Sequence, residues 1–399
     1  MNTPAKSVSG ASKHAGGTVE NANAVRNVEK ASEVRQSLKN GSSCDGSNAS
    51  NANQTKMGKA NKSEALTPEK LLRIHEFMVM TRVAEEQCIR MSRAGDGWFW
   101  IGAPGEEALG VPLGMQVKKG EGLDYDFLHL HYRSSPVVMP MGLRPIDMLR
   151  QMAAKATDPF SRGRNFVNHF AIKKWNVAPM APTIQTQYSI CIGTGIAQRR
   201  HGGTGITIVN GGDGGTHEGD FASCLIWATR PNFELPILMI TANNKYAIST
   251  GSCTQHGTEI IDRARGFKIP AVKINGNDVF ESWHAISEAM DYVRTERKPY
   301  FIEASVSRLN GHSSSSGANR VEEEDCIQMF EEQLLHRDIV TKKDLDRVWD
   351  RWREQLAADY QIVKNEPFPP GDDIWKYIFK EPKSDYYNPE PSIDKKAGR

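Results

Sequence analysis

The sequence Val209-Asn-Gly-Gly-Asp-Gly-Gly-Thr-His-Glu-Gly-Asp220 joins a β-branched segment at residues 206–210 to a helix-like stretch at residues 219–229. Its glycines let the backbone come close to a ligand and adopt positive φ, and the N–H groups that open the following helix can bind a phosphate. Asp213 would repel a phosphate unless a divalent cation lies between the two. This strand–turn–helix unit therefore predicts a site for a metal ion and a diphosphate.

A second strand end carries further candidate ligands. The apolar segment 235–241 leads into Asn243-Asn-Lys-Tyr-Ala-Ile248. Asn244 offers a side-chain oxygen and the turn offers backbone carbonyls, which are ligands that Mg²⁺ accepts. Ligands of open α/β folds bind at the carboxyl ends of the strands, so both segments are expected at one edge of a sheet. Taken separately, each segment is also typical of an ordinary turn.

Strands and helices alternate along the middle of the chain. This order predicts the α/β class: a mostly parallel sheet with helices on both faces, plus helical N- and C-terminal extensions. The first helix is expected to begin at Thr67 and Pro68, since threonine caps helix N-termini and proline suits the first turn. The expected strands are residues 206–210, 235–241, 271–275 and 300–306, with helices at residues 219–229 and 279–294.

Composition divides the chain into residues 1–65, 66–330 and 331–399. The first part is polar and lacks aromatic residues, which predicts a disordered extension. The alternative, a targeting peptide, is disfavoured by its acidic residues. The second part holds the α/β domain, and the third is a helical and Pro-rich extension. The aromatic residues of the third part favour either a partner-binding surface or packing on the chain's own domain, and they are Trp349, Trp352, Trp375, Tyr377 and Phe379.

Charge and composition exclude several classes of function. Of 399 residues, 50 are Lys or Arg and 48 are Asp or Glu, and this net charge of +2 argues against bulk electrostatic binding to nucleic acid. The longest apolar runs are far below the ~20 residues needed to cross a bilayer. Six cysteines without CxxC spacing indicate free thiols in a reducing compartment. A NAD-type dehydrogenase is disfavoured, because no GxGxxG opens a βαβ unit early in the chain.

Several motifs occur together in the order and spacing of one family. The 28 residues between Gly214 and Asn243 resemble the spacing of the thiamine-diphosphate motif. Residues 68–385 resemble the alpha subunit of the thiamine-diphosphate-dependent, decarboxylating first component of 2-oxo acid dehydrogenase complexes, the branched-chain type most and the pyruvate and acetoin types less. The matching segments are Gly105-Glu-Glu-Ala108, Tyr132-Arg133, Asn243-Asn-Lys-Tyr-Ala-Ile-Ser-Thr250, Gly276-Asn-Asp-Val-Phe280 and Arg308-Leu-Asn-Gly-His-Ser313.

The resemblance implies roles for individual residues. Asp213, Asn244 and the backbone carbonyl of Tyr246 would bind Mg²⁺. His312 would be the catalytic histidine that faces the reacting carbon of the cofactor, and an imidazole can change charge near neutral pH. Arginine suits the diphosphate because its planar fork meets phosphate oxygens in pairs. The implied cofactor-binding residues are Tyr132, Arg133, Ile184, Gly212, Asp213, Gly214, Gly215, Asn244, Arg308 and His312.

The same resemblance implies a reaction and partners. A 2-oxo acid, 3-methyl-2-oxobutanoate or another branched-chain acid, would be decarboxylated with thiamine diphosphate, and the acyl group would pass to a lipoyl group on a partner acyltransferase. A beta subunit would complete the site in an α2β2 heteromer. A pyruvate dehydrogenase alpha subunit and an inactive scaffold or regulatory homologue are the alternatives. The expected location is the cytoplasm of a bacterium, or the mitochondrial matrix of a eukaryote.

Three features depart from the family pattern. The segment that begins at His312 and ends at Arg320 is two residues shorter than usual and contains no aspartate. His217 stands where Asn or Ser is usual, and Ala242 replaces a charged residue. These differences bear on substrate choice and on whether the family's phosphorylation rules apply to Ser313, more than on cofactor binding.

Overall fold

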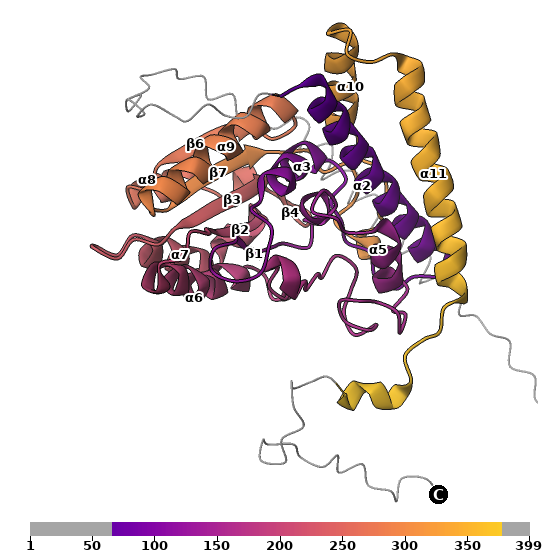
Figure 1. Cartoon of the computed structure of the whole chain (residues 1–399), viewed down its shortest axis with the longest axis horizontal. Helices are drawn as coiled ribbons and strands as arrows, with labels where there is room; N and C mark the ends of the chain where they lie inside the picture. Colours follow the sequence, from indigo (N-terminus) through magenta and orange to yellow (C-terminus); the bar gives the residue numbers. More distant parts are fainter. Residues whose placement is uncertain (1–65, 377–399) are drawn as a thin grey trace, which may run out of the picture. The chain divides into compact units, whose positions relative to one another are not determined.

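The structure, a computed structural model, describes residues 66–376. Its centre is a five-stranded sheet in the order β1-β2-β3-β7-β6, in which all neighbouring strands are parallel (Figure 1). The predicted α/β class is confirmed. The strands of this sheet are β1 (Phe127–His129), β2 (Thr207–Gly212), β3 (Ile237–Asn243), β6 (Ala271–Asn275) and β7 (Tyr300–Ser305), and β4 (Tyr246–Ala247) and β5 (Thr250–Gly251) form a separate antiparallel hairpin.

Helices cover both faces of the parallel sheet, as predicted, and each face has its own apolar core. In β3, Ile237 and Met239 point into one core. Leu238 and Ile240 point into the other, as the pleat of a strand requires. The helices on the first face are α6 (Thr186–His201), α7 (Gly219–Ala228) and α8 (Ile260–Gly266), and those on the second are α3 (Glu107–Gln116) and α9 (Val279–Glu296).

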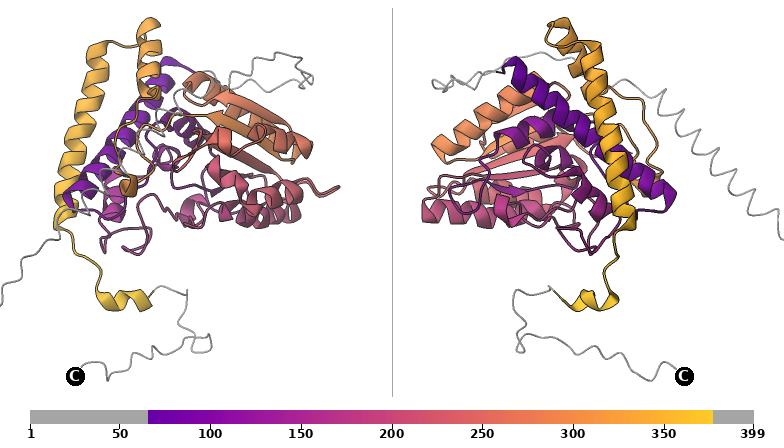
Figure 2. Two further views of the ribbon diagram at one scale, coloured as in Figure 1. Left: turned by 180° about the vertical axis from the view of Figure 1, so that it is seen from behind. Right: turned by 45° about the vertical axis from the view of Figure 1, so that its right-hand side comes forward.

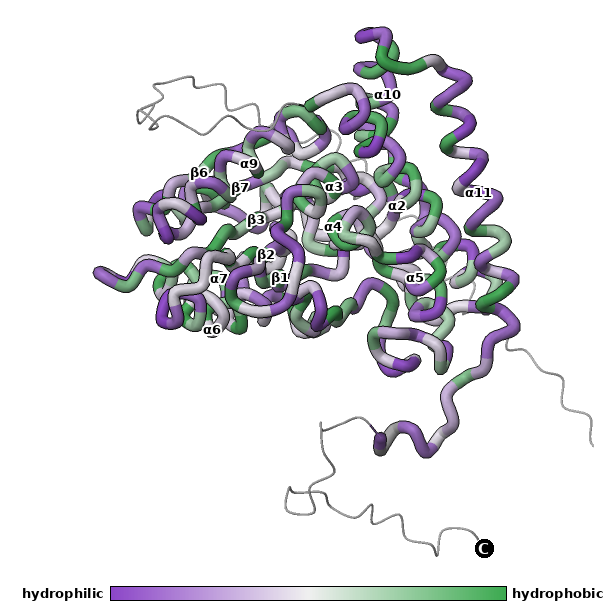
Figure 3. Tube along the Cα trace, in the orientation of Figure 1, coloured by the Kyte–Doolittle hydropathy of each residue, from purple (hydrophilic) through white to green (hydrophobic). Residues whose placement is uncertain are grey.

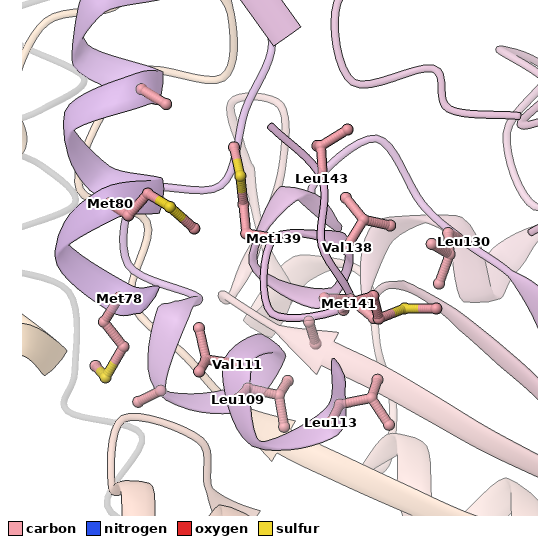
Figure 4. Packing of buried hydrophobic residues seen from close by; sticks show 14 of the residues in the cluster. Met78, Met80, Leu109, Val111, Leu113, Leu130, Val138, Met139, Met141 and Leu143 are labelled. Atoms are coloured by element: carbon pink, nitrogen blue, oxygen red, sulfur yellow. The ribbon is translucent and has the colours of Figure 1, made fainter. Parts of the chain in front are cut away.

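The larger core continues from the sheet into α2 (Pro68–Ala94) and the short helix α4 (Ser135–Val138). Figure 4 shows Met78 of α2, Leu109 of α3 and Met139 after α4 within this cluster of buried side chains. Methionine is flexible and fills irregular gaps between elements that meet at different angles. The N-terminal helix is therefore part of the same core as the sheet.

The α2 helix begins where the sequence predicts. The Thr67 hydroxyl accepts the backbone N–H of Lys70 at 3.3 Å, and Pro68 occupies the first turn. Glu69 in that turn interacts favourably with the positive end of the helix dipole. The N-cap and the helix dipole therefore both favour a helix that begins at Pro68.

The C-terminal helix α11 (Lys342–Asn365) lies along α2 (Figures 1 and 2). Its hydrophobic residues alternate with hydrophilic ones along its length (Figure 3), and Leu356 is fully buried. Trp349 donates its indole N–H to Glu331 at 2.7 Å, and Trp352 packs against the same core. Of the two interpretations of these tryptophans, packing on the chain's own domain is the one that the structure supports.

The predicted strands β2 and β3 extend two residues further than expected, so that Gly211 and Gly212 still pair with β3. Hydrogen bonds in the middle of a sheet override the low strand propensity of glycine. The strand β1 was not predicted, because three residues are too few to show a period. The remaining helices are α5 (Pro145–Met152) and α10 (Cys326–His336), with 3-10 helices η1 (Lys173–Trp175), η2 (Gly214–His217), η3 (Ser252–Thr254), η4 (Ser314–Ser316) and η5 (Gly371–Trp375).

Some predictions concern parts that the structure does not test. The extension at residues 1–65, and also Tyr377 and Phe379, lie outside the described residues. The predicted boundary after residue 330 falls inside α10, and the division into domains stays a prediction.

The composition argued against a membrane-spanning helix and against disulfides, and the described residues can be compared with both expectations. Between residues 66 and 376 no helix is long and apolar enough to cross a membrane. Within that range the cysteines are all free, as predicted.

Candidate active site

The carboxyl edge of the sheet brings the predicted segments together. β2 pairs with β3 as far as Gly212, and β3 pairs with β7 as far as Asn243. The residues that follow, Asp213 and Asn244, therefore leave neighbouring strands at the same edge. The segment after β7 carries Arg308 to this edge as well. The sequence-based expectation that these segments meet is correct.

The glycine-rich turn and the hairpin after β3 touch each other. Asp213 donates its backbone N–H to the carbonyl of Ala242 at 3.2 Å. A Cβ atom on Gly214 would lie 2.5 Å from the Cβ of Ala247, so the hairpin leaves no room for a side chain there. None of the glycines of this turn, at positions 211–215, has a positive φ. The expectation of positive φ is wrong, and close packing is the reason for glycine at residue 214.

Asp213 is the buried acid of the site. It is 1% exposed, and its Oδ2 atom has no hydrogen-bond partner. Burial raises the pKa of Asp213 to about 6, although backbone N–H groups and the charge of Arg133 act in the opposite direction. An unpaired carboxylate oxygen in the interior is costly unless a cation meets it. The orphaned oxygen therefore fits a metal ligand.

Asn244 and Tyr246 belong to the adjoining hairpin. Asn244 is buried, and its Oδ1 accepts the backbone N–H of Tyr246 at 3.1 Å. Arg308 lies over the ring of Tyr246, 5.0 Å from the centroid, and donates to the carbonyl of Ile248 at 2.9 Å. In the described part of the chain no three His, Cys, Asp or Glu side chains gather as a metal site. A carboxylate, an amide and a carbonyl are therefore the oxygen ligands that this edge offers.

Arg133 links several parts of the site. It is buried, its Nη1 donates to the carbonyl of Gly102, and its Nη2 lies 3.2 Å from Nδ1 of His312. Its Nε lies 3.6 Å from Oε1 of Glu106. The ring of Tyr132 stands edge-on to His312, with centroids 6.1 Å apart. Tyr132 and Arg133 follow β1, and this unpredicted strand is what delivers them to the carboxyl edge.

His312 is held as a neutral imidazole. Burial, together with the positive charges of Arg133 and Arg308, lowers its pKa to about 4. A guanidinium cannot accept a hydrogen bond, so Nδ1 of His312 is the acceptor and the proton of the neutral ring is on Nε2. At neutral pH the side chain therefore offers a donor at Nε2, rather than the change of charge that the residue type alone suggested.

Ile184 lies next to a residue that contacts the glycine-rich turn. It precedes α6 and is 52% exposed. The next residue, Gln185, donates its side-chain amide to the carbonyl of Gly212 at 3.0 Å. The predicted apolar residue thus lies in a segment that contacts the turn through its neighbour.

Glu106 and His131 had no role in the sequence-based assignment, yet they lie beside these residues. Glu106 is 7% exposed, and burial raises its pKa to about 8 although Arg133 is close. The rings of His131 and Tyr132 have centroids 3.7 Å apart. Burial and neighbouring positive groups lower the pKa of His131 well below its usual value. Their position within or next to the matching segments was the signal that could have identified them.

A row of aromatic side chains adjoins the site. The ring centroids of Phe99 and Phe166 are 5.3 Å apart, and those of Phe166 and His169 are 5.7 Å apart. His169 is in turn near enough to His131 to contribute to the lowered pKa of that residue. Phe166 is 47% exposed. The row is therefore partly open at the surface, and Phe99 lies three residues before Gly102, whose carbonyl accepts from Arg133.

Comparison with known proteins identifies the family that the chain resembles. The model of the family "Dehydrogenase E1 component" matches residues 75–371. "2-oxoisovalerate dehydrogenase subunit alpha" of Bacillus subtilis (strain 168) is 32% identical, over 79% of this chain and 96% of that protein. "2-oxoisovalerate dehydrogenase subunit alpha, mitochondrial" of Homo sapiens is 27% identical, over 79% of this chain and 72% of that protein. The protein of the same name from Dictyostelium discoideum is 26% identical, over 69% of this chain and 61% of its own length.

Proposed function

The chain belongs to the dehydrogenase E1 component family, whose members resemble it over most of its length, and from this membership we propose that it is the alpha subunit of a branched-chain 2-oxo acid dehydrogenase. It decarboxylates 3-methyl-2-oxobutanoate or a similar acid with thiamine diphosphate and Mg²⁺, and the acyl group passes to a lipoyl group on an acyltransferase. The observation that carries the proposal is the orphaned Oδ2 of buried Asp213, beside Asn244 and on the edge that holds Arg133 and His312.

The residues of this edge suit a magnesium–diphosphate pair. Asp213, Asn244 and the carbonyl of Tyr246 would hold Mg²⁺, which prefers hard oxygen ligands and would offset the negative charge of the diphosphate. When bound, thiamine diphosphate supplies an electron sink for the loss of carbon dioxide. The residues that would contact its diphosphate, thiazolium or linking atoms are Tyr132, Arg133, Ile184, Gly212, Gly214, Gly215, Arg308 and His312.

The chain's own residues contribute a hydrogen-bond donor, His312, and an arginine that orients it. His312 holds a proton on Nε2, and this N–H can donate to a carboxylate or oxo oxygen of the substrate. Arg133 fixes the ring by bonding to Nδ1. Because Arg133 is buried and His312 is half-buried, the hydrogen bond between them counts for more than it would on the surface.

A branched-chain substrate is supported by two observations. The aromatic row that includes Phe99 and Phe166 offers apolar area beside the site, which suits an aliphatic side chain. The relatives reported above are named for 2-oxoisovalerate. Pyruvate has a single methyl group and would leave most of such a surface unused, so it is the weaker candidate.

The proposed partners follow from the part of the cofactor for which this site offers no ligands. The described residues supply ligands for a diphosphate and a metal ion at the edge of one sheet, and the rest of the cofactor needs a second chain. The names of the relatives call them alpha subunits, which supports a beta subunit as that chain. The proposed assembly is an α2β2 heteromer that works with a lipoyl-bearing acyltransferase.

Cofactor calorimetry on the purified heteromer with its beta subunit tests the proposal. Thiamine diphosphate is titrated in the presence of Mg²⁺ into the wild type and into Asp213→Ala. The variant should bind at least about 10–100-fold more weakly, since loss of metal ligands and their supporting residues typically has that effect. Asp262→Ala, on the exposed face of α8, is the matched control and should bind like the wild type. Equal affinity of wild type and Asp213→Ala would reject this site.

A further inference from the structure

Gln185 is a buried residue with an unusual backbone conformation, and it lies outside the set assigned to the cofactor. It is 1% exposed, and its φ of 64° is in the left-handed region, which residues other than glycine seldom adopt. It is the residue that directly precedes the first turn of α6. Such conformations persist only where the surrounding structure fixes them, and they are concentrated at functional sites.

The side-chain amide of Gln185 bonds to the end of β2. Its Nε2 donates to the carbonyl of Gly212 at 3.0 Å. Its Oε1 accepts from Nε2 of Gln187 at 3.1 Å, and Gln187 also donates to the carbonyl of Asn210 at 3.1 Å. The two glutamines therefore bind alternate carbonyls of β2, and the second of these carbonyls directly precedes Asp213.

These two carbonyls face the side of β2 that β1 does not reach. The backbone N–H groups of Thr207 and Asp213 bond toward β3. Because hydrogen-bonding groups alternate in direction along a strand, the carbonyls of Asn210 and Gly212 point to the opposite side. On that side β1 pairs with β2 only as far as Val209. The glutamines therefore take the place of a strand where β2 leads into the glycine-rich turn.

The glycines of the turn make room for the side chain of Gln185. A Cβ atom on Gly215 would lie 2.3 Å from Nε2 and 2.4 Å from Cγ of Gln185, and one on Gly211 would lie 2.4 Å from its Oε1. The three atoms nearest to a Cβ on Gly215 all belong to Gln185. Because the φ of Gly215 is not positive, its backbone would accept alanine. The side chain of Gln185 is therefore the obstacle to alanine at residue 215.

We propose that Gln185 is a positioning residue: it fixes the conformation of the glycine-rich turn, and thereby the place of Asp213 toward a Mg²⁺–diphosphate pair. Its volume fills the space over Gly211 and Gly215, and its amide holds the carbonyl of Gly212. This inference rests on the proposed function, since it concerns the same site. Because Gln185 acts through the backbone of the turn, its loss should appear as weaker cofactor binding.

Calorimetry on the purified α–β heteromer, with thiamine diphosphate titrated in the presence of Mg²⁺, tests the role of the amide. Gln185→Met keeps an unbranched side chain of similar length and removes both hydrogen bonds. It should weaken binding by about 10–100-fold, the typical loss when a residue that supports metal ligands is removed.

Gln198→Met is the matched control. Gln198 is also buried, donates to the carbonyl of Tyr125 at 3.4 Å and accepts from Thr207 at 2.7 Å, at the opposite end of β2. Urea denaturation of the heteromer without cofactor should show a loss of stability for both variants, since each removes buried hydrogen bonds. Only Gln185→Met should lower the cofactor affinity, which a purely structural role would leave unchanged.

A double-mutant cycle with Gly215→Ala tests the role of the volume. In the wild-type background the added methyl group meets Gln185 and displaces the turn, so cofactor binding should weaken at least about tenfold. In a Gln185→Ala background the methyl group has the freed space, and Gly215→Ala should cause almost no further loss, because one contact couples the two sites. If Gly215→Ala does not fold, a folded and cofactor-binding double variant would support the same conclusion.

Two results would overturn the inference: a cofactor affinity of Gln185→Met equal to that of Gln198→Met, or a Gly215→Ala substitution that is equally harmful in both backgrounds. A wild-type heteromer that does not bind thiamine diphosphate with Mg²⁺ would instead contradict the proposed function, so the two failures are distinguishable.

Discussion

The hydrogen bond between Arg133 and His312 shows how one contact sets the chemistry of a side chain. A free imidazole near neutral pH exists in three forms, charged and two neutral tautomers. The positive charge of Arg133 disfavours the charged form, and its donor N–H selects the tautomer with a proton on Nε2. The ring is therefore prepared as a hydrogen-bond donor, and in the proposed reaction this would lower the reorganisation that is required.

His312→Ala should lower kcat by a much larger factor than it lowers cofactor affinity. Proton transfer or donation by a positioned side chain contributes about 10²–10⁴-fold, and that factor should be lost. Steady-state decarboxylation and cofactor calorimetry on the heteromer measure the two effects. His284→Ala, an exposed histidine on α9, is the control that should retain the wild-type rate. Loss of cofactor binding with an intact turnover per bound cofactor would contradict the assigned role.

The residues of the site differ in how far the sequence could identify them. Asp213 and Asn244 were predictable, since each directly follows an apolar strand and parallel strands end at one edge. The closeness of Glu106 to Arg133, 27 positions further along the chain, was not predictable, because it depends on how the fold brings two separate segments together. The tautomer of His312 was also beyond sequence reasoning, since it depends on which nitrogen meets the guanidinium.

Among the elements, α2, α3 and α10 are joined by one arginine. Arg82 of α2 bonds to Glu107 of α3 at 2.6 and 2.9 Å and to Asp325, the N-cap of α10, at 2.7 and 3.1 Å. Arg320 also bonds to Asp325, at 2.7 Å. The end of the segment from His312 to α10 is therefore tied to α2 and α3 by an ionic network around the buried Asp325.

Asp325→Asn should destabilise the folded protein, and the loss should depend on pH. Burial would raise the pKa of Asp325, but the hydrogen bonds from Arg82 and Arg320 and the charge of Arg82 lower it to about 2. At pH 7 the substitution should cost about 1–3 kcal/mol, as expected for a hydrogen-bonded charged group. Urea denaturation of the heteromer measures the difference in unfolding free energy.

The sign of the pH dependence follows from the direction of the pKa shift. The folded-state pKa of Asp325 lies below the ordinary value of about 3.9, so its stabilising contribution is complete above that value. It should then fade as pH drops from about 4 toward 2, through the folded-state pKa. A difference between wild type and variant that grows on acidification would be the opposite of this expectation.

The elements were predictable to different degrees. β6 and the start of α2 match the predicted bounds, because a β-branched run and an N-cap are local signals. β1 was missed, since a three-residue strand depends on pairing with β2 rather than on its own composition. The position of α11 along α2 was left open, because an amphipathic helix alone does not reveal what covers its apolar face.

At the scale of the whole molecule, the chain is expected to be an obligate heteromer. Large hydrophobic residues remain exposed on α6 and α7, namely Ile190, Ile226 and Trp227. Apolar surface of this kind is typically covered in stable assemblies. The chain produced alone should therefore aggregate and be inactive, whereas production together with its beta subunit should give a soluble α2β2 species. Mass measurement in solution and activity assays distinguish the two, and a soluble, monomeric and fully active single chain would refute the prediction.

The proposed cofactor-dependent decarboxylation of a branched-chain 2-oxo acid can be measured as release of labelled carbon dioxide. The α–β heteromer is given 2-oxo acids that carry ¹⁴C at carbon 1. The assay compares 3-methyl-2-oxobutanoate, pyruvate and 2-oxoglutarate, each with and without thiamine diphosphate and Mg²⁺. Release should require both additions and should be fastest, by kcat/KM, with 3-methyl-2-oxobutanoate. Release from none of the three acids in the complete mixture, or release that persists without the cofactor and the metal, would contradict the proposed function.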